Sequence, residues 1–119
     1  MASGEEPRLN QWRSFVEEWL PTLGLQGWAI EVRDDCPIPD TDWANVRVWV
    51  GQQRAQIRLA PDFKTQAPSE QRRLLLHELM HVVLQDYQLG VAESQWQAWE
   101  WLVIDKVASI LSRIEEASA

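Results

Sequence analysis

The sequence contains little cysteine, little histidine and no excess of positive charge. Its single cysteine, Cys36, excludes a disulfide within the 119 residues and suits a reducing compartment. No apolar run approaches the ~20 residues that cross a bilayer, and the first residues lack the basic and apolar regions of a secretory signal. These absences lead us to expect a cytoplasmic protein without a membrane partner.

The charge balance is acidic, with a formal net charge of −7. Binding to nucleic acid or to an anionic membrane requires lysine and arginine gathered on one surface. Here the basic residues are scattered along the chain and form no basic stripe, so we expect no nucleic-acid partner. The hydrophobic content of 45% is ordinary for a globular protein, and the eight tryptophans are expected to lie mostly in its core.

The hydrophobic pattern predicts a small α+β domain over residues 1–119, with residues 1–8 flexible. Its sheet is expected to have three strands and to be mostly antiparallel, with the last two strands forming a hairpin. The oligomeric state is not indicated. In chain order, the expected elements are a helix over 9–20, strands over 27–33, 43–50 and 56–59, a helix from 68 or 69 to about 86, and a last helix over about 92–115.

The two histidines of the chain, His77 and His81, occur in the pentapeptide His-Glu-Leu-Met-His within the predicted helix that begins at 68 or 69. Residues four apart lie on one helix face, so both imidazoles can reach one metal ion, and zinc accepts such ligands. Glu78 is rotated away from the pair and can take a proton from water at the metal. The apolar flanks would exclude water, and a metal explains why such polar residues occur in an apolar helix. An exposed polar face without a metal is the alternative interpretation.

A third ligand must be a carboxylate, because no third histidine exists. Glu100 is favoured because it lies on the apolar stripe of the last predicted helix, beside Trp99 and Val103. Glu93 shares that face and is the alternative, although an acidic residue at a helix start is usually solvated. Asp105 is expected to point away from the stripe.

His77, Glu78 and His81, followed by a helix that carries Glu100, resemble the gluzincins, and most closely their minimal, often phage- or prophage-encoded members. The resemblance implies a zincin-like fold and a Zn²⁺-dependent metallopeptidase. In such an enzyme a zinc-activated water hydrolyses a protein or peptide substrate, with Glu78 as the general base. It also implies that an extended substrate adds to an edge strand formed by Gln56, Ile57, Arg58 and Leu59. The family's aspartate after the glutamate ligand, which supports a histidine, is not evident, because Ile104 is four residues after Glu100 and Asp105 is one further.

Three points stay open at this level. Tyr87, the only tyrosine, is the candidate donor to a transition-state oxyanion, although it can equally be a structural residue. Cys36 lies in a predicted loop, and its thiolate can also bind zinc. The same ligands can instead stabilise a regulatory or interaction module that binds zinc without turnover.

Overall fold

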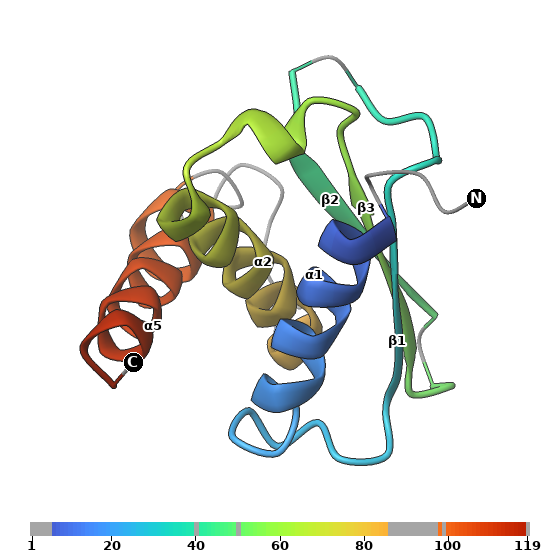
Figure 1. Ribbon diagram of the computed structural model, residues 1–119. Coiled ribbons are helices and arrows are strands. Elements are labelled where there is room, and N and C mark those ends of the chain that lie inside the picture. The colour runs from blue at the N-terminus through green and yellow to red at the C-terminus, as the bar shows by residue number, and fades with distance from the viewer. Residues whose placement is uncertain (1–5, 40, 50, 86–97, 99, 119) are drawn as a thin grey trace.

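The computed structural model describes residues 6–39, 41–49, 51–85, 98 and 100–118, and it is an α+β structure. The described helices α1, α2 and α5 lie on one side of a three-stranded sheet (Figure 1). No helix in these ranges is long and apolar enough to cross a membrane. The elements are α1 (Glu6–Trp19), β1 (Ala29–Arg33), β2 (Ala44–Trp49), β3 (Arg54–Leu59), η1 (Phe63–Thr65), α2 (Pro68–Val83), η2 (Glu100–Ile104) and α5 (Asp105–Ser118).

The sheet is mixed, with the strand order β1-β3-β2. β2 and β3 are antiparallel, with Val46 opposite Ile57, which confirms the predicted hairpin. β1 and β3 are parallel, with Val32 opposite Ile57. The expectation of a mostly antiparallel sheet was therefore wrong, because the chain crosses from β1 to the far edge of the sheet and β3 then returns between the two earlier strands.

This order also corrects the predicted edge strand. Gln56, Ile57, Arg58 and Leu59 belong to β3, which is paired on both sides. Its backbone groups are therefore engaged by β1 and β2 and cannot accept an added strand. Ile57 and Leu59 are in addition fully buried, at 0% exposure. β2 is the outer strand of the sheet on the side of α2 and η2.

The core lies between the sheet and the helices. Ile57 and Leu59 point from β3 toward the buried face of α2, which contributes Leu75, Leu76 and Leu79 to the same cluster. α1 adds Trp12, which packs edge-on against Phe63 with 5.1 Å between ring centroids. The indole Nε1 of Trp12 also donates to Gln71 Oε1 at 3.0 Å, which fixes α1 to α2. This packing holds α2 rigidly under the sheet, as a site on that helix requires.

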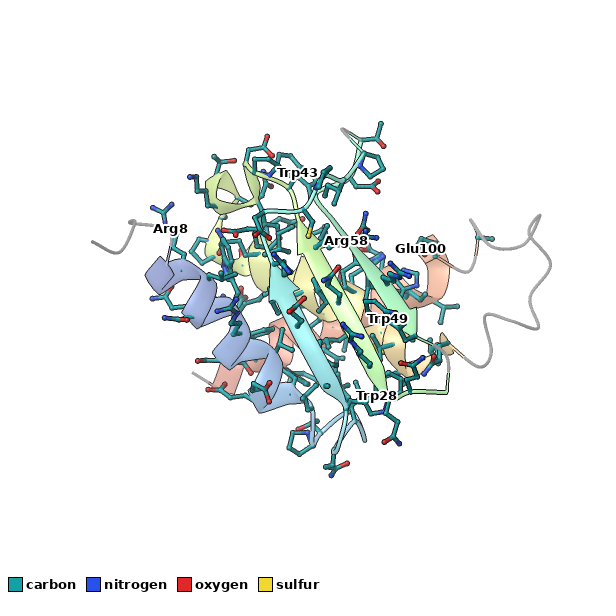
Figure 2. All side chains as sticks on the ribbon, turned by 90° about the vertical axis from the view of Figure 1, so that its right-hand side faces the viewer. Arg8, Trp28, Trp43, Trp49, Arg58 and Glu100 are labelled. Atoms are coloured by element: carbon teal, nitrogen blue, oxygen red, sulfur yellow. The ribbon has the colours of Figure 1, made fainter. Side chains whose placement is uncertain are left out.

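The start of the first helix and the burial of the tryptophans differ from what the sequence predicts. α1 begins at Glu6, three residues before the predicted start of the first helix, while residues 1–5 lie outside the described ranges. Among the described tryptophan side chains, Trp12 and Trp19 are buried in the core. Trp43, however, is 39% exposed, and Trp49 lies on the outer face of the sheet (Figure 2).

The start of the predicted last helix, with Trp96 and Trp99, lies outside the described ranges. From Glu100 the chain forms a π-helical turn, η2, which continues into α5. A π-helical turn closes from residue i to residue i+5 and inserts one residue relative to α-helical spacing. Residues five apart therefore share a face here, and this shift decides which side chains reach the histidines.

Candidate metal centre

Both histidines are buried on α2. The helix begins at Pro68, whose missing N–H is harmless in the first turn, and its middle is packed under the sheet. His77 and His81 are 8% and 9% exposed, and their ring centroids are 5.2 Å apart. The four-residue spacing thus places the two imidazoles side by side, as the sequence predicted.

Glu100 reaches both imidazoles from η2. Its Oε1 lies 2.5 Å from Nε2 of His77 and 2.8 Å from Nε2 of His81. One ligand atom from each of the three residues lies within 4.8 Å of the others, so this cluster can hold a metal ion. Figure 2 shows Glu100 beside β2, at the edge of the sheet. Glu93, the alternative ligand, lies outside the described residues.

The donor set fits a small cation. Two ligands of one tetrahedral zinc stand about 3.3 Å apart, given bonds of ~2.0–2.1 Å. The contacts of Glu100 with the two Nε2 atoms, at 2.5 and 2.8 Å, are hydrogen bonds and are shorter than that. The carboxylate would therefore have to move away from both nitrogens to share an ion with them, while the three ligand atoms already lie within 4.8 Å of one another.

Asp105 supports His77, which corrects the expectation that it points away. Its Oδ1 lies 3.2 Å from Nδ1 of His77, on the opposite side of the ring from Glu100. The π-helical turn is the reason, because it brings the residue five positions after Glu100 onto the same face. Ile104, at the α-helical spacing, is instead fully buried in the interior.

Asp105 is itself held in place by Arg73, one turn before His77 on α2. Arg73 Nη1 donates to the same Oδ1 atom that faces His77, and Arg73 Nη2 donates to Glu70. These two carboxylates raise the pKa of Arg73 above its usual value, although its partial burial acts in the opposite sense. The guanidinium therefore orients the carboxylate that orients the imidazole.

The ionisable groups of the cluster change one another's pKa values. Burial lowers the pKa of His77, but its hydrogen bond to Glu100 and the nearby charge of Glu78 raise the pKa more, to a net value above 6.5. Burial raises the pKa of Glu100, yet the hydrogen bonds from both histidines lower this pKa to about 2. Both ring nitrogens of His77 face carboxylate oxygens, so without a metal this ring favours the imidazolium form.

Glu78 is buried, at 6% exposure, and lines the same pocket as His81 and Glu100. Burial raises the pKa of Glu78 to about 8; the carboxylates of Glu100 and Asp42 contribute in the same sense, while His77 opposes them. Among the described residues, no side chain donates a hydrogen bond to Glu78. A buried carboxylate without a hydrogen-bond donor is stabilised in its charged form by any further positive charge in the pocket.

The pocket, of about 450 Å³, lies between α2 and β2. Asp42 and Asn45, which line it, had not been anticipated, because a loop residue and a strand residue carry no signal of proximity to a distant helix. Three of its lining residues are acidic, and β2 contributes mostly small and β-branched side chains. The lining residues are Asp42, Ala44, Asn45, Val46, Val48, Glu78, His81 and Glu100.

Two candidates of the sequence analysis remain. Tyr87 lies outside the described residues. Cys36 contacts Asp35 Oδ1 at 3.9 Å and does not belong to the cluster that can hold a metal. Comparison of the chain with protein-family models, with curated proteins and with solved structures gives no match.

Proposed function

We propose that this protein is a zinc-dependent metallopeptidase of the gluzincin type, with His77, His81 and Glu100 as metal ligands. One observation carries the proposal. Three ligand atoms converge to within 4.8 Å of one another, and the carboxylate of Glu78, buried and without a hydrogen-bond donor among the described residues, lines the same pocket. A purely structural metal site has no need of such a carboxylate beside its ligands.

The donor chemistry favours zinc. Two imidazole nitrogens and one carboxylate oxygen form the ligand set of several zinc peptidases, and three protein ligands leave one tetrahedral position open. When bound, the zinc ion supplies a Lewis acid that polarises a carbonyl and makes water more acidic. Hard cations such as Mg²⁺ and Ca²⁺ prefer oxygen ligands throughout, so two histidines disfavour them.

The remaining side chains of the site have two roles in the proposed reaction, the positioning of His77 and the transfer of a proton. Asp105 and Arg73 fix the ring of His77, so that its Nε2 is aimed at the cluster. Glu78 accepts a proton from the attacking water and delivers it to the nitrogen of the departing amine. Its burial excludes bulk water, which would otherwise compete for that proton.

The substrate lies along β2 in this proposal. β2 pairs with β3 on one side, and no described strand pairs with its other side. Val46 and Val48 of β2 line the pocket, so a peptide extended along this strand passes directly over Glu78 and the metal ligands. The edge strand expected from the sequence is thereby reassigned from β3 to β2.

Metal content and turnover test the proposal separately. Protein purified without chelators should contain about one zinc per chain and should cleave unfolded casein or members of a peptide library. Glu78→Gln should keep its zinc and its fold but lose about 100-fold or more in rate, as is typical of a lost general base. Glu18→Gln, an exposed change on α1, is the matched control and should behave as wild type.

Two outcomes would contradict the proposal. A Glu78→Gln variant that cleaves as fast as wild type would exclude Glu78 as the base. A wild-type protein that holds stoichiometric zinc and cleaves no member of the library would instead favour the zinc-stabilised regulatory module.

A further inference from the structure

Strand pairing gathers the arginines that are scattered in the sequence. Side chains alternate along a strand, so residues opposite one another in neighbouring strands share a face. Arg58 lies opposite Asn45 in β2 and Arg33 in β1, while Arg54 lies opposite Trp49. These side chains lie on the outer face of the sheet, which no described helix covers (Figure 2). Basic residues that form no stripe in the sequence are thus brought together locally by the sheet.

The positive charge is not spread evenly over this face. On the β1 side, Arg33 donates two hydrogen bonds to Asp35, at 2.9 and 2.8 Å, and Glu31 lies 3.8 Å from the same guanidinium. Gln56 Nε2 also donates to Glu31, at 2.6 Å. The β1 side therefore carries two acidic groups, Glu31 and Asp35, against the one positive charge of Arg33, which they neutralise.

On the side of β2 and β3, the arginines have no carboxylate partner among the described residues. The guanidinium carbons of Arg47 and Arg54 lie 4.6 and 4.2 Å from the ring centroid of Trp49, as cation–π pairs. Arg58 donates from Nε to Asn45 Oδ1 at 2.9 Å, an uncharged acceptor. We refer to Arg47, Trp49, Arg54 and Arg58 as the arginine patch. It carries three positive charges on a chain whose net charge is −7.

The arginine patch adjoins the metal centre through β2. Val46 and Val48 face the pocket from one side of this strand, while Arg47 and Trp49 lie on its other side. Asn45 belongs to both regions, because it lines the pocket and accepts the hydrogen bond from Arg58. The patch and the pocket therefore lie on opposite faces of the same edge strand, with Asn45 between them.

We propose that the arginine patch docks an acidic polypeptide segment. Guanidinium groups pair with carboxylates through two parallel hydrogen bonds, and two of them lie against the ring of Trp49 without a carboxylate partner among the described residues. A short run of aspartate or glutamate matches a patch of this extent, whereas a long polyanion would also meet the acidic remainder of the chain. Trp49 is moreover covered by two guanidiniums, which disfavours the stacking of a nucleobase on its ring.

Docking can be tested without any cleavage. We suggest fluorescence anisotropy with a labelled peptide of alternating glutamate and threonine, and with its glutamine counterpart, against the full chain carrying Glu78→Gln. The acidic peptide should bind and weaken with salt, and the glutamine peptide should not bind. Arg47→Gln/Arg54→Gln should weaken binding about tenfold or more, since two charge pairs are lost. Because this assay needs no turnover, a failure of the proposed peptidase function would leave its result unchanged.

Arg8→Gln/Arg113→Gln is the matched control, because it removes the same charge from exposed positions on α1 and α5. It should weaken binding less than about twofold. Arg47→Lys/Arg54→Lys keeps the charge and should retain part of the affinity. Circular dichroism of each variant checks that the fold is intact.

Several outcomes would overturn the proposal. The proposal fails if wild-type protein does not bind the acidic peptide. It also fails if the patch variant and its control lose equal affinity for that peptide. Binding of labelled oligothymidylate, but not of the peptide, with the same dependence on Arg47 and Arg54 would assign the patch to single-stranded nucleic acid. Concentration-dependent dimers that dissociate in the patch variant, without peptide binding, would assign it to a second copy of the chain.

Discussion

Nδ1 of His77 lies 3.2 Å from Oδ1 of Asp105, while Nε2 of the same ring faces Glu100 at 2.5 Å. One imidazole is thus held between two carboxylates that are separated by a single π-helical turn. A ring held in this way has a fixed orientation before any metal arrives, which reduces the cost of assembling the site.

Asp105→Asn should weaken zinc binding about 10- to 100-fold, as is usual when a carboxylate that supports a histidine ligand is removed. The amide keeps the shape but supplies no charge to hold the Nδ1 proton. Competition with a chromophoric zinc chelator would measure the change. Asp62→Asn, on an exposed turn, should leave the affinity within about twofold, and an unchanged affinity in Asp105→Asn would show that the contact has no supporting role.

Glu100→Ala should abolish stoichiometric zinc binding, because only two imidazoles remain as ligands. Glu93→Ala should retain zinc fully if Glu100 is the third ligand. Elemental analysis after native purification, together with a thermal melt of each variant, distinguishes a lost ligand from a lost fold. Zinc retained in Glu100→Ala and lost in Glu93→Ala would reverse the assignment.

Zinc affinity should fall as the pH falls, and it should begin to fall above pH 6.5. The metal needs the unprotonated Nε2 of His77, and the pKa of this ring is raised above 6.5, so protons compete for it earlier than for an ordinary histidine. Below that pKa the apparent affinity should drop about tenfold per pH unit for each proton displaced. Chelator competition across a pH series would measure the slope, and a pH-independent affinity would exclude His77 as a ligand.

Protein stripped of metal should lose stability as the pH rises from about 4.5 to about 8. Over this range Glu78 is ionised in the unfolded chain, whose pKa is near 4.5, but stays protonated in the fold, where its pKa is about 8. The folded state thus binds more protons, so the contribution of Glu78 to stability is complete below pH 4.5 and decreases until the pKa of about 8 is reached.

Glu78→Gln removes this titration. The stripped variant should therefore show a flatter dependence of its melting temperature on pH, and at pH 8 and above it should melt higher than stripped wild type. Thermal melts in the presence of a chelator would measure both curves. Parallel curves for the two proteins would show that Glu78 is not protonated in the stripped fold.

The parts of the site that depend on local spacing were predictable. His77, Glu78 and His81 lie within five residues of one helix, and the geometry of an α-helix alone brings the two imidazoles together. Glu100 was predicted because a carboxylate on an apolar stripe is unusual. Asp105 was not, because the apolar pattern does not reveal a π-helical turn, and the inserted residue reverses the side on which Asp105 lies.

The parts that depend on long-range pairing were not predictable. The alternation of each strand is visible in the sequence, but the position of β3 between β1 and β2 depends on pairing between segments far apart in the chain. The same pairing brings Arg33, Arg54 and Arg58 onto one face, although β1 and β3 are widely separated in the chain. A scattered charge pattern in a β-rich segment therefore says little about the surface that it forms.

The ligands come from two helical segments, α2 and η2, with 19 residues of sequence separation between His81 and Glu100. An ion bound to both would act as a reversible cross-link between these two segments of the chain. Like a disulfide, such a cross-link removes conformations from the unfolded chain, and the stabilisation grows with the loop that it closes. A chain with one cysteine cannot form an internal disulfide, so a bound metal would be its available cross-link between α2 and the η2–α5 segment. The concentration of free metal would then determine the stability of the fold as well as the chemistry of the site.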